Sequence, residues 1–451
     1  MPGTIGGVAT THPVLGTDPA VLHSRAYVNL LVVSALLGVP ISAAAFAFLQ
    51  LVHEAQHGVY EVLPEALGYA HTPAWWAIPP LVVAGLIVGY CVRYLPGRGG
   101  HTPADGIDTG HAPPRGRELG GITLAAVASL ALGAVVGPEA PLIGLGAGAA
   151  AWAVRLMNRG VADQAVLLVG AAGSFAAISM LLGNPLLGAF LLMEVSALGG
   201  AALGMVLLPG LLSAGIGALV IVGLGSLTGL GTVSLSVPDL PTLVRPDVVQ
   251  LGWAVAIGLL APFLGVPIAR MGRAVRDWSQ PRPMLATPVA GLLVGLLALG
   301  YATGSHRSVT EVVFSGETAL GPLIDNAADY SVATLLLLML CKGLAYGLSL
   351  GAFRGGPVFP AMFLGAAGGL VLSHLPGLPP VSGAAMGIGA MCVVMLRLPL
   401  TAVLLATLLL ASGLTLMPLV IVSVVVAHVM TAYLTREGRT PAARPERATV
   451  P

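Results

Sequence analysis

The sequence predicts an all-α, polytopic membrane protein built from two inverted halves with many tilted and broken helices. Three observations lead to this prediction: the apolar composition, the clustering of the charges and an internal repeat. Hydrophobic residues make up 56% of the chain and charged residues 9%, whereas globular domains carry about 25% charged residues. This composition excludes a soluble enzyme, a nucleic-acid-binding protein and a disordered chain.

Long apolar runs separate the few charges. Glu139 is the only charged residue within residues 119–154, and Glu194 is the only one within residues 164–238. Apolar stretches of about 20 residues predict membrane-spanning helices. Several runs are shorter and are interrupted by Gly and Pro, which indicates broken helices that end inside the bilayer. The cysteines lie in apolar runs, so we expect them to be buried rather than paired or metal-bound.

Basic residues predict the orientation of the chain. By the positive-inside rule, its arginine clusters face the cytoplasm, whereas the acidic loop at 304–330 faces outward. We expect a multi-pass protein of the bacterial inner (plasma) membrane with both termini cytoplasmic. Neither a cleaved signal peptide nor an appended regulatory domain is expected. The expected parts are a cytoplasmic arm at 1–25, a transmembrane domain at 26–436 and a cytoplasmic tail at 437–451.

An internal repeat divides the transmembrane domain. Residues 137–147 (GPEAPLIGLGA) and 356–366 (GPVFPAMFLGA) match at six positions in one register. A second echo pairs Pro185-Leu186 with Pro399-Leu400. We interpret these matches as two homologous halves, roughly 26–230 and 247–436, of inverted topology. Direct parallel repeats would give the same signal.

The repeated element predicts an anion site. In each copy a Gly-Pro pair is followed by a proline that fits the first turn of an apolar helix. The first N–H groups of a helix have no internal partner, and the helix dipole adds positive charge there. A helix that starts inside the membrane can therefore bind an anion without a buried lysine. A plain proline kink is the alternative. The candidate anion-binding positions are Gly137, Pro138, Ala140, Gly356, Val358 and Phe359.

Glu139 lies inside one copy of the repeat. An ionisable residue within the membrane is costly and predicts a functional site. At a helix N-terminus its carboxylate could occupy the pocket that an anion would use, and leave when it is protonated or displaced. The alternative is an acid that only stabilises its own helix.

Three segments resemble the CLC chloride channels and chloride/proton exchangers. Residues 137–141 are similar to the family's G-(K/R)-E-G-P motif, residues 342–360 to its stretch ending in G-x-F-x-P, and residues 184–194 to its N-x-P-L-x-G-x-x-x-x-x-E helix. The resemblance extends from about residue 28 to 436. It implies a homodimer in the lipid bilayer, one pathway per subunit for chloride or a related small inorganic anion, Glu139 as the gating glutamate, and no cofactor or enzymatic activity.

The chain departs from the family's pattern at several positions. Pro138, Ala140, Pro357 and Val358 replace the usual residues, and each proline removes an N–H donor. The family's serine loop falls near 99–106, where His101 or Thr102 could substitute for the serine. Its inner-gate tyrosine is missing from residues 438–445, and Tyr433 lies too early in the chain.

The proton-relay position of the exchangers is lost. They carry two adjacent acids where this chain has Glu194-Val195, and valine cannot carry a proton. We therefore favour passive anion flux, with a structural role for Glu194. The alternative is a proton-coupled chloride antiporter on the same fold.

A zinc protease is the rival from a different class. His53, Glu54 and His57 form an H-E-x-x-H motif, which on a helix places two imidazoles on one face. The motif lies at the end of an apolar run beside a polar loop, the third ligand of membrane-embedded proteases is missing, and the repeat is left unexplained. We therefore expect no metal site.

The sequence also predicts where two further cationic residues lie and what they do. Lys342 opens an apolar segment and is expected to extend its ammonium group to the interface. Arg354 precedes the second anion-site candidate and could raise the local anion concentration, or be a simple loop charge.

Overall fold

The structure is a computed structural model that describes residues 24–107, 112–196, 201–228, 246–408 and 413–435. These residues are helical apart from their connections, with no strand among them. Eight of the described helices are long and apolar enough to cross a membrane, and shorter apolar helices of 10–17 residues accompany them. The predicted all-α polytopic fold with broken helices is therefore confirmed. The N-terminal arm up to residue 23 and the tail from 436 lie outside the described residues.

The chain forms two compact units, which we describe separately. Unit 1 comprises residues 1–49, 108–119 and 142–234, and unit 2 comprises residues 50–107, 120–141 and 235–451. The first helix, α2 (Arg25–His57), begins in unit 1 and ends in unit 2.

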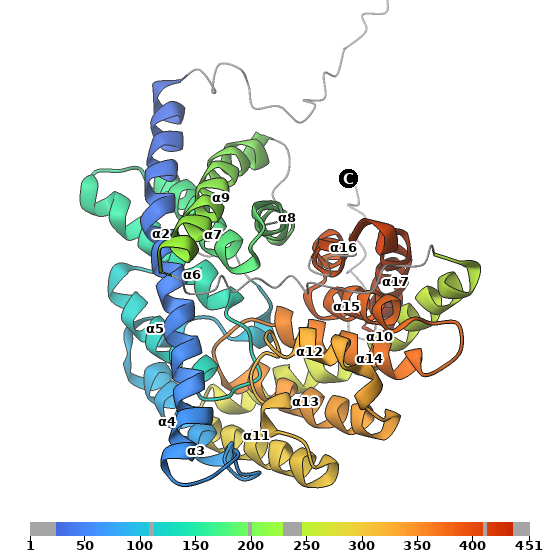
Figure 1. The fold of residues 1–451 in the computed structure, drawn as a ribbon. Coiled ribbons are helices and arrows are strands. Elements are labelled where there is room, and N and C mark those ends of the chain that lie inside the picture. The colour runs from blue at the N-terminus through green and yellow to red at the C-terminus, as the bar shows by residue number, and fades with distance from the viewer. Residues whose placement is uncertain (1–23, 108–111, 197–200, 229–245, 409–412, 436–451) are drawn as a thin grey trace, which may run out of the picture. The chain divides into compact units, whose positions relative to one another are not determined.

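Unit 1 is built around α7 (Asp163–Leu182), which packs against α8 (Pro185–Val195) and α9 (Ala201–Thr228) (Figure 1). The start of α8 follows from its sequence, because the Asn184 side chain accepts hydrogen bonds from the N–H groups of Leu186 and Leu187 and Pro185 needs no donor. Helix α6 (Glu139–Met157) approaches α7 closely, since a Cβ on Gly146 would lie 2.5 Å from the Gly173 carbonyl oxygen.

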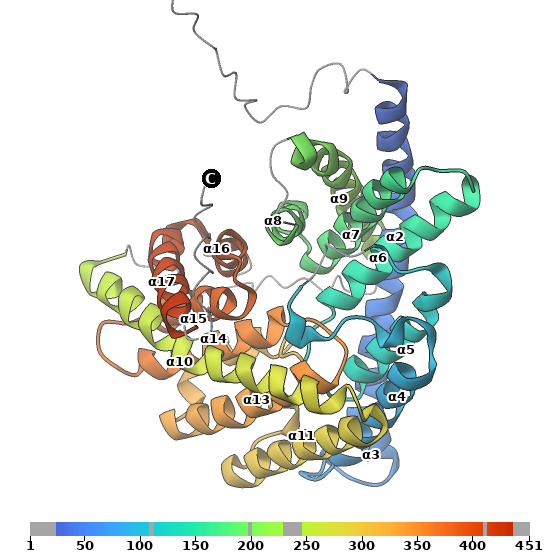
Figure 2. The same cartoon turned by 180° about the vertical axis from the view of Figure 1, so that it is seen from behind.

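Unit 2 holds the helices of the second half of the chain. Its packed pairs include α11 with α4, α14 with α15, and α10 with both α13 and α17, as Figures 1 and 2 show from opposite sides. The bounds of these helices are α4 (Ile78–Tyr94), α5 (Gly116–Ala131, of which 120–131 belong here), α10 (Val248–Ser279), α11 (Pro283–Ser305), α12 (Leu320–Asp325), α13 (Val332–Ala352), α14 (Val358–Ser373), α15 (Pro380–Leu396), α16 (Pro399–Leu408) and α17 (Gly413–Leu434).

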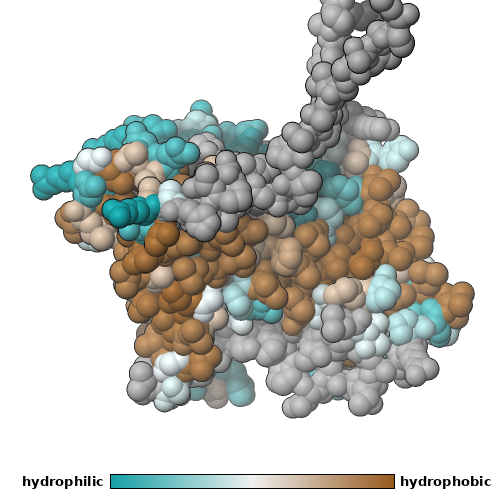
Figure 3. Space-filling model, turned by 90° about the horizontal axis from the view of Figure 1, so that it is seen from above, coloured by the Kyte–Doolittle hydropathy of each residue, from teal (hydrophilic) through white to brown (hydrophobic). Residues whose placement is uncertain are grey.

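Apolar side chains lie on the outside of the molecule as well as in its core. They cover most of the coloured surface in Figure 3, with hydrophilic side chains at its margins. In unit 2 the exposed large apolar residues include members of α10 and α11, namely Leu259, Leu260, Phe263, Leu285, Leu292 and Leu296. A lipid environment, and not water, accounts for such a surface. The three cysteines are free and buried, as predicted.

Small residues allow the helices of unit 2 to approach closely, as is common in membrane bundles. We predict that Gly383→Ala in α15 destabilises the protein by about 1–3 kcal/mol, the usual cost of overpacking. Its new Cβ would lie 2.6 Å from the Gly369 carbonyl oxygen of α14. Gly252→Ala in α10 is the matched control, because nothing lies within 4 Å of its Cβ. Thermal unfolding in detergent measures both, and equal midpoints would contradict the prediction.

Candidate anion site at two helix starts

The two copies of the repeat meet through their backbones in unit 2. The N–H of Gly137 donates to the carbonyl of Gly356 at 2.7 Å, and the N–H of Gly356 donates to the carbonyl of Gly137 at 2.5 Å. Helix α6 begins two residues after the first glycine and α14 two residues after the second. The two helix N-termini that the sequence singled out therefore lie side by side.

The carboxylate of Glu139 joins the two helix starts. It is fully buried, and its Oε1 accepts a hydrogen bond from the backbone N–H of Phe359 at 3.0 Å. Its Oε2 has no hydrogen-bond partner among the described residues. Glu139 thus occupies the first turn of its own helix with its backbone and caps the other helix with its side chain, where the dipole favours a negative charge.

Two glycines beside this carboxylate leave the space that it occupies. A Cβ on Gly137 would lie 2.6 Å from the Glu139 Cδ, and a Cβ on Gly356 would lie 2.7 Å from the same atom. Both distances are shorter than real contacts, so any larger residue would displace the carboxylate. The Gly137–Gly356 pairing and the Glu139 contact are therefore parts of one arrangement.

Polar groups of α13 fix the connections that lead into both helices. The hydroxyl of Tyr346 donates to the carbonyl of Pro357 at 2.6 Å, and the Ser349 hydroxyl accepts from the N–H of Val135 at 3.1 Å. The sequence analysis missed both residues. Their signal was the spacing of a tyrosine and a serine, three residues apart in a mostly apolar helix that also carries Lys342, which places both hydroxyls on one face.

Lys342 is buried, so the expectation that it extends to the interface is wrong. Its side chain is 0% exposed, and its Nζ donates to four consecutive carbonyls, those of residues 311 and 312 at 3.0 Å and of 313 and 314 at 3.3 Å. The ring of Phe363 lies 4.4 Å from Nζ. A buried cation is tolerated when its donors are satisfied, and here backbone oxygens replace water.

The loop that this lysine joins to α13 also contacts the segment that precedes Glu139. Within the loop, the N–H of Phe314 donates to the carbonyl of Gly133 at 3.2 Å, and its ring packs edge-on against Tyr60 with centroids 4.8 Å apart. The hydroxyl of Tyr60 in turn donates to the carbonyl of Leu132 at 3.0 Å.

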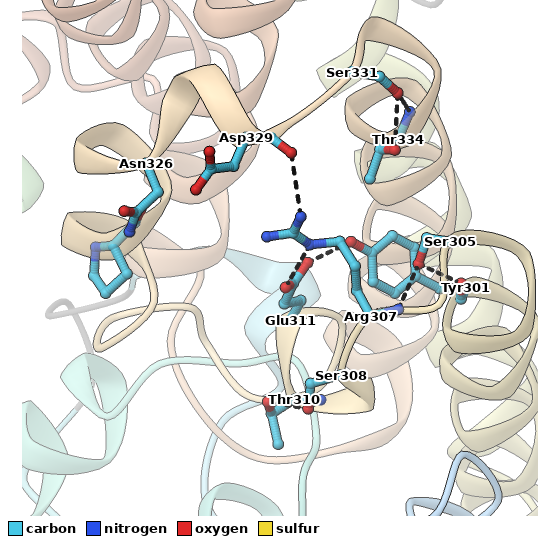
Figure 4. Close-up of polar contacts among 11 residues, drawn as sticks. Tyr301, Ser305, Arg307, Ser308, Thr310, Glu311, Asn326, Asp329, Ser331 and Thr334 are labelled. Atoms are coloured by element: carbon cyan, nitrogen blue, oxygen red, sulfur yellow. Dashed lines mark hydrogen bonds and ion pairs between the residues drawn. The ribbon is translucent and has the colours of Figure 1, made fainter.

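A polar network closes the other end of the same loop (Figure 4). The Arg307 Nε donates to Glu311 at 3.0 Å, and its guanidinium stacks 3.7 Å from the ring centre of Tyr330. Tyr301, from α11, donates its hydroxyl to the second oxygen of Glu311. The loop is therefore rigidly held at both ends.

Glu317 lies in this loop and is a second carboxylate that the sequence analysis missed. Its Oε1 is enclosed without a hydrogen-bond partner among the described residues, and burial raises the pKa of its carboxyl to about 7. Its charge acts on Glu139, and two neighbouring carboxylates disfavour each other's ionisation. A single acid in a loop that carries four has no sequence signal of its own.

The segment in which the family's serine loop is expected begins in a tight turn of unit 2. Gly97, Arg98, Gly99 and Gly100 all have positive φ, between 47° and 86°. His101 is exposed, whereas Thr102 is buried at 6% exposure. Arg354 also is buried, at 6% exposure, so a simple surface charge does not describe it.

Glu194 and Val195 end α8 in unit 1, and residues 438–445 lie outside the described part of the chain.

The H-E-x-x-H motif ends α2, where His57 pairs with Glu61 at 3.3 Å and both side chains are exposed. Among the described residues no group of three or more metal-ligating side chains gathers, and the zinc-protease alternative finds no support.

Fold and site together define a class of protein: a polytopic membrane protein whose two repeats present helix N-termini to one buried carboxylate. The family model described as "Voltage gated chloride channel" matches residues 84–432. The chain therefore belongs to the voltage-gated chloride channel, or CLC, family.

Relatives agree with this assignment. The chain is 26% identical over 392 residues to the "Putative ion-transport protein YfeO" of Salmonella paratyphi A, covering 83% of this chain and 88% of that protein. A slow cyanobacterial Cl⁻/H⁺ antiporter is similar in structure, with a TM-score of 0.71, 20% identity and coverage of 90% and 95%. A CLC-type fluoride/proton antiporter gives a TM-score of 0.67 at 20% identity and the same coverage. These structural likenesses concern the fold.

We predict that Glu317→Gln changes how stability depends on pH. Below about pH 4.5 the carboxyl is protonated in both folded and unfolded chains, so the variant and the parent differ little. Between about pH 4.5 and the folded pKa of about 7, the carboxyl ionises in the unfolded chain before it ionises in the folded one, so the parent loses stability as the pH rises. The variant therefore gains about 1–2 kcal/mol over the parent across this range, and the difference stays constant at higher pH. Unfolding midpoints in detergent from pH 4.5 to 8 measure this gain. Glu65→Gln, at an exposed position, is the control, and a gain that is constant with pH would contradict the prediction.

Proposed function

We propose that this protein is a passive pathway for chloride or a related small anion, gated by the side chain of Glu139. The coarser assignment to membrane ion channels and transporters follows from the family. The observation that carries the finer proposal is the hydrogen bond of 3.0 Å from the Phe359 N–H to the Glu139 carboxylate. A carboxylate held by that group stands where a small anion would bind.

The donors of the site are backbone groups whose positions are fixed before any ion arrives. The α14 N-terminus, which begins with Val358 and Phe359, supplies N–H groups and the positive end of its dipole. The bridge between Gly137 and Gly356 uses their N–H groups, and Pro138 and Pro357 have none. We therefore assign anion binding to the start of α14, with Gly137, Ala140 and Gly356 shaping the space.

The gate opens when the carboxylate leaves. Glu139 gives up the hydrogen bond from the Phe359 N–H and the attraction of a helix dipole. Its Oε2 loses no hydrogen bond, since it has no partner among the described residues. Protonation removes the charge that the dipole attracts, and an incoming anion can take the same N–H. Both routes remove the carboxylate from the start of α14, so a weakly held carboxylate suits a gate.

Passive flux is favoured over exchange because the relay position is Val195, whose side chain carries no proton. Two structurally similar proteins are a Cl⁻/H⁺ antiporter and a fluoride/proton antiporter, so proton coupling is the alternative on this fold. The proposal further includes a homodimer, two inverted halves at roughly 26–230 and 247–436, cytoplasmic termini in a bacterial inner membrane, and His101 or Thr102 beside the pathway. No cofactor is required by this mechanism.

We predict that Glu139→Gln changes chloride efflux from liposomes loaded with potassium chloride, in the presence of valinomycin and with external pH recorded. Glutamine has no charge to hold at the helix start, so efflux should rise about two- to tenfold. Parent efflux should increase as the pH falls, because protonation frees the site, whereas the variant should not respond to pH.

Glu54→Gln is the matched control, since it also removes one carboxylate, at an exposed position on α2. Stoichiometric proton movement with chloride in the parent would establish the antiporter instead. Equal rates and equal pH profiles for the parent and Glu139→Gln would overturn the gating role.

A further inference from the structure

The gate carboxylate is closed off from solvent. Glu139 is 0% exposed, and its Oε1 accepts a hydrogen bond from the Phe359 N–H. Its Oε2 is enclosed and has no partner among the described residues. In the proposed mechanism this carboxylate leaves when it is protonated, so a proton must reach it from water. Buried acids that exchange protons with water commonly do so through a second titratable side chain.

Glu317 is the second carboxylate with an enclosed oxygen that lacks a partner. Its Oε1 is enclosed, but the residue as a whole is only partly buried. The carboxyl therefore stands at the boundary between the protein interior and the solvent. In the described part of the chain, Glu139 and Glu317 are the only acidic residues with an oxygen of this kind.

The backbone next to Glu317 lies against the helix that holds the gate. Gly316 packs on α14, because a Cβ at this position would come within 2.7 Å of the Phe363 ring. Phe363 is four residues after Phe359 and so lies on the same face of α14, one turn further on. Because the Phe359 N–H binds the Glu139 carboxylate, the two acids approach the same helix near its start. The charge of Glu317 accordingly acts on Glu139.

Two contacts keep the loop in this place. The Nζ of Lys342 donates to the carbonyls of residues 311–314, and the N–H of Phe314 donates to the carbonyl of Gly133 at 3.2 Å. Both contacts lie just before Glu317 in the chain, and the second joins the loop to the segment that leads into α6. All these residues belong to unit 2, so the position of Glu317 relative to the gate is fixed within one compact unit.

The other titratable groups on the surrounding elements have partners elsewhere. Lys342 binds carbonyls of the loop, and Glu311 accepts from Arg307. The hydroxyls of Tyr60 and Tyr346 donate to backbone carbonyls, and α14 contributes no titratable side chain. Glu317 is therefore the acid on these elements that is free to exchange a proton with Glu139.

We propose that Glu317 is the acid that carries protons from the solution to Glu139 and thereby controls how fast the gate opens. This inference rests on the proposed function and adds a residue to it. In the step, the Glu317 carboxyl loses its proton and remains as a carboxylate, and the Glu139 carboxylate accepts that proton on an oxygen. Neutral Glu139 is no longer attracted by the dipole of α14, and Glu317 takes its next proton from water.

The environment of Glu317 suits this exchange. Burial raises the pKa of its carboxyl to about 7, and a group that transfers protons works best when its pKa is near the working pH. Two neighbouring carboxylates also disfavour each other's ionisation, so a single proton can be shared between them. The proton enters and leaves on the side of the membrane where the loop lies. No acid is then needed at Val195, and anion flux stays passive.

Chloride efflux after a rapid drop in external pH tests the proposal in liposomes. Efflux from the parent should accelerate promptly, whereas in Glu317→Gln, which carries no proton, the acceleration should be slower by at least about tenfold. Glu317→Asp keeps an acid and should restore most of the rate. Glu65→Gln is the matched control, because it removes an exposed carboxylate and should behave as the parent. A response as fast as that of the parent in Glu317→Gln overturns the proposal.

A double variant distinguishes a proton carrier from a structural residue. In a chain that already carries Glu139→Gln, adding Glu317→Gln should leave efflux unchanged, since no gate carboxylate remains to be protonated. A lower efflux and a lower unfolding midpoint in both backgrounds would show a structural role and overturn the proposal. Glu317→Gln removes a carboxylate with an unsatisfied oxygen, so the variant should fold at least as well as the parent.

Time-resolved infrared spectroscopy separates this inference from the proposed function. The band of the protonated Glu139 carboxyl is identified by its loss in Glu139→Gln, and after a drop in pH it should appear more slowly in Glu317→Gln than in the parent. A slower band without any efflux from the parent would reject passive conduction and leave the proton carrier standing. Efflux that depends on Glu139, with equal band kinetics in the parent and Glu317→Gln, would do the reverse.

Discussion

The reciprocal hydrogen bonds between Gly137 and Gly356 are the constraint on which the site depends. They join two helix starts that lie 219 positions apart in the chain, and they use the N–H groups that would otherwise need partners in the membrane. Because both positions lie against the Glu139 carboxylate, a side chain at either one would displace it. The absence of side chains at these two positions leaves the space that the carboxylate occupies at the start of α14.

Three buried charged residues of unit 2 differ in how many of their polar atoms have hydrogen-bond partners. Lys342 donates to four carbonyls and holds a loop, so its donors are used within the protein. Glu139 has one backbone donor and one oxygen without a partner. Arg354 keeps an enclosed donor unpaired. Since a buried polar group without a partner costs free energy, the satisfied charge of Lys342 suits a permanent support, and the incompletely bonded Glu139 carboxylate suits the exchange with an ion that we propose.

The sequence predicted the fold because membrane helices are encoded locally, by apolar runs and by the prolines that begin them. It also predicted Glu139, because a lone acid in an apolar run is conspicuous. It failed for Lys342 and was incomplete for Arg354, since their surroundings come from residues distant in the chain. The carbonyls that bind Lys342 lie 28 to 31 positions before it, and no periodicity reports such a contact. Glu317 was missed for the same reason.

The places of Pro138 and Pro357 in the structure explain their effect on the site. Pro138 and Pro357 remove donors next to the site, which limits how firmly it can hold any negative group. The same limit applies to the carboxylate and to an ion, because both use the N-terminus of α14. The Tyr346 hydroxyl donates to the carbonyl of Pro357 and keeps that turn in place. The site therefore keeps its geometry although the prolines supply no N–H donors. In the proposed mechanism, a site with few donors favours ready exchange between the Glu139 carboxylate and an ion.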